Sequence, residues 1–170
     1  MSTQMIYTLF GGKEGLMAAL YHASFERLSA HMNTVLYDRD PVAYLRALTQ
    51  AMRQFAHAQP MFYEMMFGRS LPHFTPPMAD SMRQSSPYQL LLQTLQTIPP
   101  TRAPRELHAD ALWMAIHGAL GMELAGFFTD EEQASSRFGA MIDGLLAGFN
   151  HPQGSAKQTE TKDGLGLFDP

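Results

Sequence analysis

"STQMIYTLFGGKEGL", residues Ser2–Leu16, has the pattern of a short helix, a turn and the start of a longer helix. The pair Gly11-Gly12 predicts the turn, because glycine adopts left-handed backbone angles without steric cost. From Lys13 to about Leu36, apolar residues recur at spacings of three to five, which is the spacing of a helical stripe. The stretch therefore predicts a two-turn helix, a tight turn and a long second helix.

Proline and capping residues divide the rest of the chain into further helices. Asp40-Pro41 predicts a helix start, because aspartate caps free backbone N–H groups and proline fits the first helical position. Ser86-Pro87 is a second start signal, and Thr129 with Glu132 predicts a capping box. We expect an all-α fold with helices over residues 41–59, 61–67, 78–98 (broken at Ser86), 107–128 and 130–150, and a loop over 68–77.

The composition is that of a folded globular chain. Of the 170 residues, 45% are hydrophobic and 16% are charged, so the length suits one sizeable core. The sequence has no cysteine, which excludes disulfides, thiolate metal sites and cysteine nucleophiles. The net charge of -4 is not the balance of a nucleic-acid-binding protein over the whole chain.

Neither a secretory signal nor a membrane span is predicted. The apolar stretch 109–128 carries Asp110, His117 and Glu123, and ionisable groups are costly inside a bilayer. We therefore expect a soluble helix, a cytoplasmic protein and no membrane partner.

The motifs of common enzymes are missing, and we expect no catalytic activity, no cofactor and no metal site. His117 shares a helix side with Asp110 and Trp113. It is either a polar group in a ligand site or a hydrogen-bonded core histidine, and both readings stay open. Glu123 is expected to be an interface or surface charge. Arg39, Arg46 and Arg53 recur every seven residues and are expected on a solvated face.

Two further groups of residues are candidates for binding. Aromatic and methionine side chains at helical spacing are typical of a core, and they also line cavities for apolar ligands. The candidates are Phe55, Phe62, Tyr63, Met66, Phe67, Met82, Tyr88, Trp113 and His117. Small residues on the last two long helices indicate close helix approach, which a symmetric dimer through a four-helix bundle would use. The candidates for the dimer interface, in which Met122 interrupts the small residues, are Ala115, Gly118, Met122, Ala125, Ala140, Gly144, Ala147 and Gly148.

Three stretches together resemble one family. Residues 2–16, with Ser2, Tyr7 and Lys13-Glu14, resemble the recognition helix and following turn of TetR-type transcriptional regulators. Residues 112–128, with Trp113 and His117-Gly118, are similar to the Trp-His-Gly element of one class of TetR C-terminal domain, and residues 55–67 fit the same class. The resemblance covers roughly residues 2–150.

The resemblance implies a homodimer with an N-terminal helix-turn-helix and a C-terminal domain for ligand binding and dimerisation. It divides residues 1–150 into a partial helix-turn-helix over 1–16 and an effector and dimerisation domain over 17–150. The polar, glycine-rich composition of residues 151–170 predicts a disordered tail. The resemblance also implies that Thr3, Gln4 and Met5 face base edges of operator DNA, while Tyr7 and Lys13 contact phosphates.

The family has two helices before the recognition helix, and this sequence starts at the recognition helix. A two-turn helix alone is marginal in water, so the chain as given is not expected to bind operator DNA specifically. Either its start codon is placed too late, which we favour, or it is a truncated regulator. The leading hypothesis is a ligand-responsive TetR-type regulator, a repressor, with a small apolar effector. The alternative is a dimeric helical module that binds or sequesters a small molecule without binding DNA.

Overall fold

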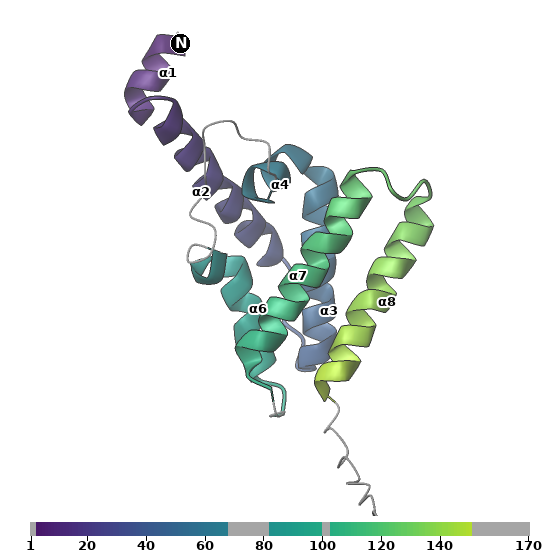
Figure 1. Cartoon of the computed structure of the whole chain (residues 1–170). Coiled ribbons are helices and arrows are strands. Elements are labelled where there is room, and N and C mark those ends of the chain that lie inside the picture. Colours follow the sequence, from purple (N-terminus) through teal and green to yellow (C-terminus); the bar gives the residue numbers. More distant parts are fainter. Residues whose placement is uncertain (1–2, 68–81, 100–102, 151–170) are drawn as a thin grey trace, which may run out of the picture.

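The computed structural model describes residues 3–67, 82–99 and 103–150, and all regular structure in these ranges is helical. The predicted loop at 68–77 and the predicted tail at 151–170 lie outside the described residues. The all-α fold class is confirmed (Figure 1). The helices are α1 (Thr3–Phe10), α2 (Lys13–Met32), α3 (Pro41–Ala58), α4 (Pro60–Phe67), α6 (Ser86–Gln96), α7 (Arg105–Leu124) and α8 (Glu131–Asn150).

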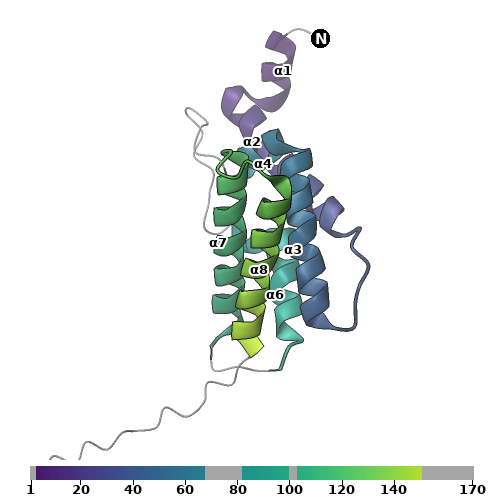
Figure 2. The same ribbon diagram turned by 90° about the vertical axis from the view of Figure 1, so that its right-hand side faces the viewer.

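The predicted helix, glycine turn and long helix are present at the N-terminal end. Gly11 and Gly12 have φ angles of 72° and 106°, so the turn uses the left-handed region. α1 packs on α2 and projects beyond the rest of the bundle (Figures 1 and 2). α2 ends at Met32, four residues before the predicted end, and Leu36 is exposed.

Gly15 is the position where the α1–α2 turn has no room for a side chain. A Cβ at Gly15 would lie 1.7 Å from the backbone oxygen of Phe10. We expect Gly15→Ala to undock α1 and raise the rate of chymotrypsin cleavage after Phe10 several-fold. Because α1 lies outside the core, unfolding stability should change by less than about 1 kcal/mol. In Gly139→Ala, a control with open space around the Cβ, cleavage should be unchanged; equal cleavage of the two variants would contradict the prediction.

The body of the protein is a bundle in which α3 is central. α3 contacts α2, α4, α6, α7 and α8 (Figure 2). Its start is as predicted, with the Asp40 side chain accepting a hydrogen bond from the Val42 N–H at 2.9 Å and Pro41 in the first turn. The fully buried core joins residues of all the long helices, among them Leu28, Leu45, Phe55, Leu91, Leu112, Ile116 and Leu146.

The predicted end of α7 and the predicted cap of α8, which border the connection between these two helices, are both wrong. α7 ends at Leu124 rather than at Phe128, because Gly126 takes a φ of 74° and closes the helix. The N–H groups of Gly126 and Phe127 donate to the carbonyls of Glu123 and Met122, at 3.0 Å each. α8 is capped by Asp130 instead of Thr129, since the Asp130 carboxylate accepts from the Glu132 N–H at 2.9 Å. The restart at Ser86 is confirmed.

None of the helices in the described ranges has the length and apolar character that a membrane span requires.

Candidate functional site

An aromatic cluster surrounds His117 where α4 meets α7. α7 supplies Trp113 and His117 one turn apart, and α4 supplies Tyr63 and Phe67, also one turn apart. The ring centroids of Phe67, Trp113 and Tyr63 lie 3.9, 4.5 and 5.6 Å from that of His117. The His117 ring therefore packs against three aromatic side chains.

One ring nitrogen of His117 has a partner and the other does not. The hydroxyl of Tyr63 lies 2.6 Å from Nδ1. Nε2 is buried and has no hydrogen-bond partner among the described residues. Burial lowers the pKa of His117 from its ordinary 6.5 to about 3, because the charged form cannot be solvated there. Burial also raises the pKa of the Tyr63 hydroxyl. Both groups are neutral at neutral pH.

The low pKa of His117 gives a pH prediction. Below its ordinary value of 6.5 the unfolded chain takes up a proton that the folded chain does not, until pH falls to about 3. Stability should therefore fall as pH falls through this window, with a slope of up to about 1.4 kcal/mol per pH unit from this group. In His117→Phe this part of the slope should vanish, although the lost hydrogen bond to Tyr63 lowers stability at every pH. Urea unfolding across the window measures both slopes, and equal slopes would refute the assignment.

The structure brings only some of the predicted ligand-binding residues to His117. Tyr88 of α6 packs edge-on against Trp113 at 5.6 Å between centroids, so it extends the cluster. Phe55 faces His31, and Phe62 is covered by the guanidinium of Arg27 at 4.4 Å from its ring centroid. All eight candidates besides His117 are part of the core or pack against it: Phe55, Tyr63, Met66, Tyr88 and Trp113 are buried, and Phe62, Phe67 and Met82 are half-buried.

Asp110, which the sequence places on the same helix side as His117, joins α7 to α6. Its carboxylate accepts from the hydroxyl of Tyr88 at 2.7 Å and from Arg83 at 2.7 Å. Burial and this hydrogen bond raise the pKa of Tyr88 to about 12. Asp110 thus fixes Tyr88 against Trp113 and does not reach His117 in these contacts.

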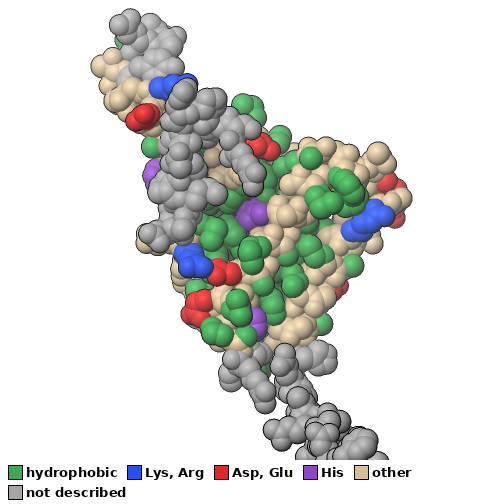
Figure 3. Space-filling view, in the orientation of Figure 1, with side chains coloured by type: hydrophobic (Ala, Val, Ile, Leu, Met, Phe, Trp, Pro, Cys, Tyr) green, Lys and Arg blue, Asp and Glu red, His purple; other side chains and the backbone are tan. Residues whose placement is uncertain are grey.

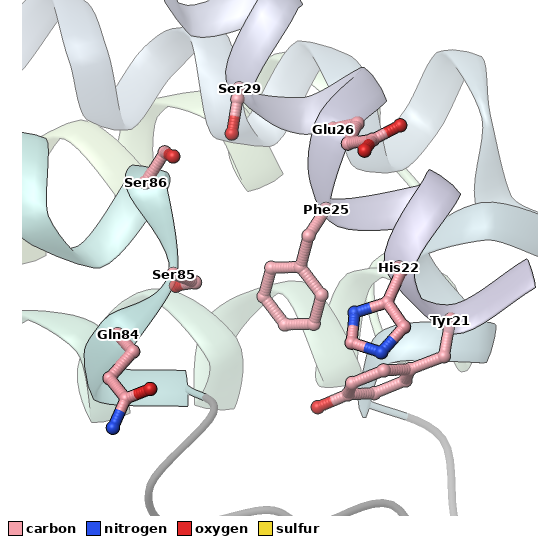
Figure 4. Close-up of a pocket in the computed structure, with 8 residues that line it drawn as sticks. All are labelled: Tyr21, His22, Phe25, Glu26, Ser29, Gln84, Ser85 and Ser86. Atoms are coloured by element: carbon pink, nitrogen blue, oxygen red, sulfur yellow. The ribbon is translucent and has the colours of Figure 1, made fainter. Parts of the chain in front are cut away.

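A cavity of about 280 Å³ lies between α2 and the start of α6 (Figure 4). It was missed by the sequence analysis, because its lining comes from two segments about 60 residues apart in the chain. Figure 4 shows Phe25 pointing from α2 into the space that Ser85 and Ser86 face. The Phe25 ring packs on Phe67 at 5.7 Å between centroids, which connects the cavity wall to the His117 cluster. The lining residues are Tyr21, His22, Phe25, Glu26, Ser29, Gln84, Ser85 and Ser86.

A buried charge cluster corrects two expectations from the sequence. Arg53 is not on a solvated face: its side chain is 6% exposed, and its Nε lies 2.9 Å from Glu123. Glu123 is not a surface charge, since its side chain is 2% exposed and also lies 2.6 Å from Nε2 of His57. Arg53 reaches Glu131 at the start of α8 as well, at 3.0 Å. The cluster therefore ties α3, α7 and α8 together.

The small residues of α7 and α8 lie on the outer side of this helix pair. Of the eight candidates for a dimer interface, Ala115 is half-buried and the other seven are exposed. A Cβ at Gly118, Gly144 or Gly148 would meet nothing within 4 Å, so these glycines do not serve close packing within the chain. An apolar groove of about 400 Å³ runs between the two helices, lined by Gly118, Met122, Phe138 and Met141 among others. In Figure 3 hydrophobic side chains are spread over the face that α7 presents.

The predicted DNA-contacting residues lie on α1 and at the start of α2. Met5 is 59% exposed, and Lys13 is exposed at the first residue of α2. The side chains of Thr3, Gln4 and Tyr7 lie outside the described residues. Leu9 and Phe10 are exposed too, at 73% and 39%, so α1 presents apolar as well as polar side chains.

Comparison with known proteins places the bundle in a family. Residues 45–145, more than half of the chain, match the family model described as "Tetracyclin repressor-like, C-terminal domain". This range runs from α3 into α8 and contains Arg53, Glu123 and the whole His117 cluster. No match was found among curated proteins. The chain belongs to the tetracyclin repressor-like family, of which it carries the C-terminal domain.

Proposed function

We propose that the protein is a ligand-responsive transcriptional regulator of TetR type that represses transcription as a homodimer. The main observation in support of this proposal is that α2 contacts α1 at one end and α3, α4 and α6 along its length. A change in the bundle that moves α2 therefore moves α1. The family is one of regulatory domains, which fits this proposal better than an enzyme does.

The effector site that we propose is the His117 cluster together with the neighbouring cavity. A small apolar molecule there would contact Phe25 on α2 and Phe67 on α4. Its binding would favour one position of α2 over another, and thereby change the spacing of the two α1 helices of a dimer. To shift the population from 1:99 to 99:1 the effector must bind one state about 5.5 kcal/mol more tightly.

The homodimer that we propose forms through α7 and α8. The observations in support are the exposed small residues on both helices and the open space at Gly118, Gly144 and Gly148. Helices whose contact face consists mostly of glycine and alanine can approach closely. A two-fold axis would pair the same face of both copies. Four helices, two from each copy, would then form the interface.

The DNA-binding role falls on α1. We assign base contacts to Thr3, Gln4 and Met5, and phosphate contacts to Tyr7 and Lys13. Lys13 supports this assignment because it is exposed at the start of α2, where free backbone N–H groups also favour an anion.

The proposal is tested by titrating DNA from the region around the gene with the chain and with any longer in-frame product of that gene. For a product with a whole helix-turn-helix, fluorescence anisotropy should show binding that weakens steeply with salt, because phosphate contacts release counterions. An apolar effector should release the DNA. If neither product binds DNA at low salt, the regulator proposal is rejected.

The alternative function, a dimeric module that sequesters a small molecule, is favoured by one observation. α1 packs on α2 while its apolar residues Leu9 and Phe10 stay exposed, so α1 is held less firmly than a groove-reading helix needs. Dimerisation and ligand binding without DNA binding at any salt concentration would identify this module.

A further inference from the structure

His117 carries a buried nitrogen that the described part of the structure leaves unsatisfied. Nδ1 lies 2.6 Å from the Tyr63 hydroxyl, whereas Nε2 is buried without a hydrogen-bond partner among the described residues. Buried polar groups in folded proteins are almost always hydrogen-bonded, so an unsatisfied one packed against aromatic rings is an atom to which a bound molecule can supply the missing partner. A ligand would therefore gain most binding free energy from a hydrogen bond to Nε2.

The contact with Tyr63 decides which kind of group Nε2 is. If the Tyr63 hydroxyl donates to Nδ1, the proton of the neutral imidazole is on Nε2, and this N–H is left unpaired. If instead Nδ1–H donated to the tyrosine oxygen, both the hydroxyl hydrogen and the Nε2 lone pair would be unpaired. The first arrangement leaves fewer buried groups unsatisfied. Nε2–H is thus a hydrogen-bond donor.

The surroundings of this donor select against charged ligands. The groups in contact with the ring are aromatic: Tyr63, Phe67 and Trp113. A carboxylate would lose its hydration there without gaining a cation, since burial keeps His117 neutral by lowering its pKa to about 3. An ammonium group has no lone pair to accept from Nε2–H.

We propose that the effector is a neutral molecule with an apolar body and one accepting oxygen, such as a ketone, ester or ether, and that this oxygen accepts a hydrogen bond from Nε2–H of His117. This inference rests on the proposed function, in that it names the chemical class of the effector.

The cavity between α2 and α6 is linked to His117 by a chain of aromatic contacts. Phe25 forms part of its wall (Figure 4). Phe25 packs on Phe67, and Phe67 lies over His117 with 3.9 Å between ring centroids. A molecule in this cavity would contact the Phe25 ring, and displacement of Phe25 and Phe67 would bring it toward His117. The displaced Phe25 belongs to α2, the helix that contacts α1.

The test uses four probes with the same ring and different heads: cyclohexyl methyl ketone, ethylcyclohexane, cyclohexanecarboxylate and cyclohexylmethylamine. Trp113 is the only tryptophan of the sequence and contacts His117, so its emission reports binding at this site. We expect saturable changes with the ketone and the hydrocarbon. The ketone should bind about tenfold more tightly, the ratio that one net hydrogen bond supplies. The two charged probes should bind more weakly than the hydrocarbon.

Variants test the role of His117 itself. In His117→Phe, which keeps an aromatic ring, the ketone should lose its roughly tenfold advantage while the hydrocarbon binds as before. His108→Phe is the matched control, because His108 is also buried, has a ring nitrogen without a partner in the described part of the chain, and packs on Phe149 instead. It should keep the preference.

The inference is overturned if no probe changes Trp113 emission, if a charged probe binds best, or if His117→Phe keeps the ketone preference. DNA titration tests the proposed function independently of the effector class. Release of DNA by a charged effector, for example, would retain the regulator and reject the neutral effector class.

Discussion

Glu123→Ala is expected to destabilise the protein by about 3–5 kcal/mol, because it leaves the buried guanidinium of Arg53 without its main counter-charge. Arg53 would keep only Glu131, whose side chain is 74% exposed and screened by water. His57 would lose its partner as well. Urea unfolding followed by circular dichroism measures the loss.

Two further variants separate charge pairing from general damage. Asp143→Ala breaks the pair between Asp143 and Arg46, whose side chains are both about half exposed, and should cost less than about 1 kcal/mol. The double variant Arg53→Met/Glu123→Leu replaces the buried pair by apolar side chains and should recover most of the lost stability. If Glu123→Ala costs no more than Asp143→Ala, the buried pair does not hold α3 to α7.

Gly144→Glu is expected to raise the dissociation constant of the proposed homodimer at least about a hundredfold. In a two-fold interface each substitution occurs twice, so two carboxylates lose water close to each other, which costs several kcal/mol. Every 1.4 kcal/mol raises the dissociation constant about tenfold. Gly144 is exposed on α8 with open space around its Cβ, so the monomer itself should fold normally. Sedimentation velocity over a range of concentrations measures the constant.

Ala30→Glu is the control for this substitution. Ala30 is exposed on α2, so the same charge is added away from α7 and α8, and the dimer should persist. If Gly144→Glu remains dimeric at the concentrations at which the unmodified chain does, the dimer does not use this face of α8, and the proposed assembly is rejected.

The helices could be predicted from the sequence because their signals are local. The left-handed turn at Gly11-Gly12, the Asp40 cap and the restart at Ser86 each depend on residues within one helical turn. The two errors at helix ends have the same local origin. At α8, both Asp130 and Thr129 are suitable capping residues, and Asp130 takes the position. At α7, the apolar run continues past Gly126, although the positive φ of Gly126 ends the helix.

The pairing of distant side chains could not be predicted. Arg53 and Glu123 are 70 positions apart, and nothing in either local pattern distinguishes a buried charge from an exposed one. The contact between Tyr63 and His117 spans 54 positions. Tertiary packing alone determines that the other nitrogen of His117 has no partner among the residues that the structure describes. From the sequence, His117 could equally be a polar group in a ligand site or a hydrogen-bonded core histidine.

The sequence by itself determined the all-α class, the order of the helices and the small-residue face of α7 and α8, since these follow from backbone preferences and side-chain period along a single helix. Only the tertiary structure decided which polar groups are buried, which of them are paired and where a cavity opens. Burial and pairing depend on which helices come together in space, and that arrangement brings together residues that have no common signal along the chain.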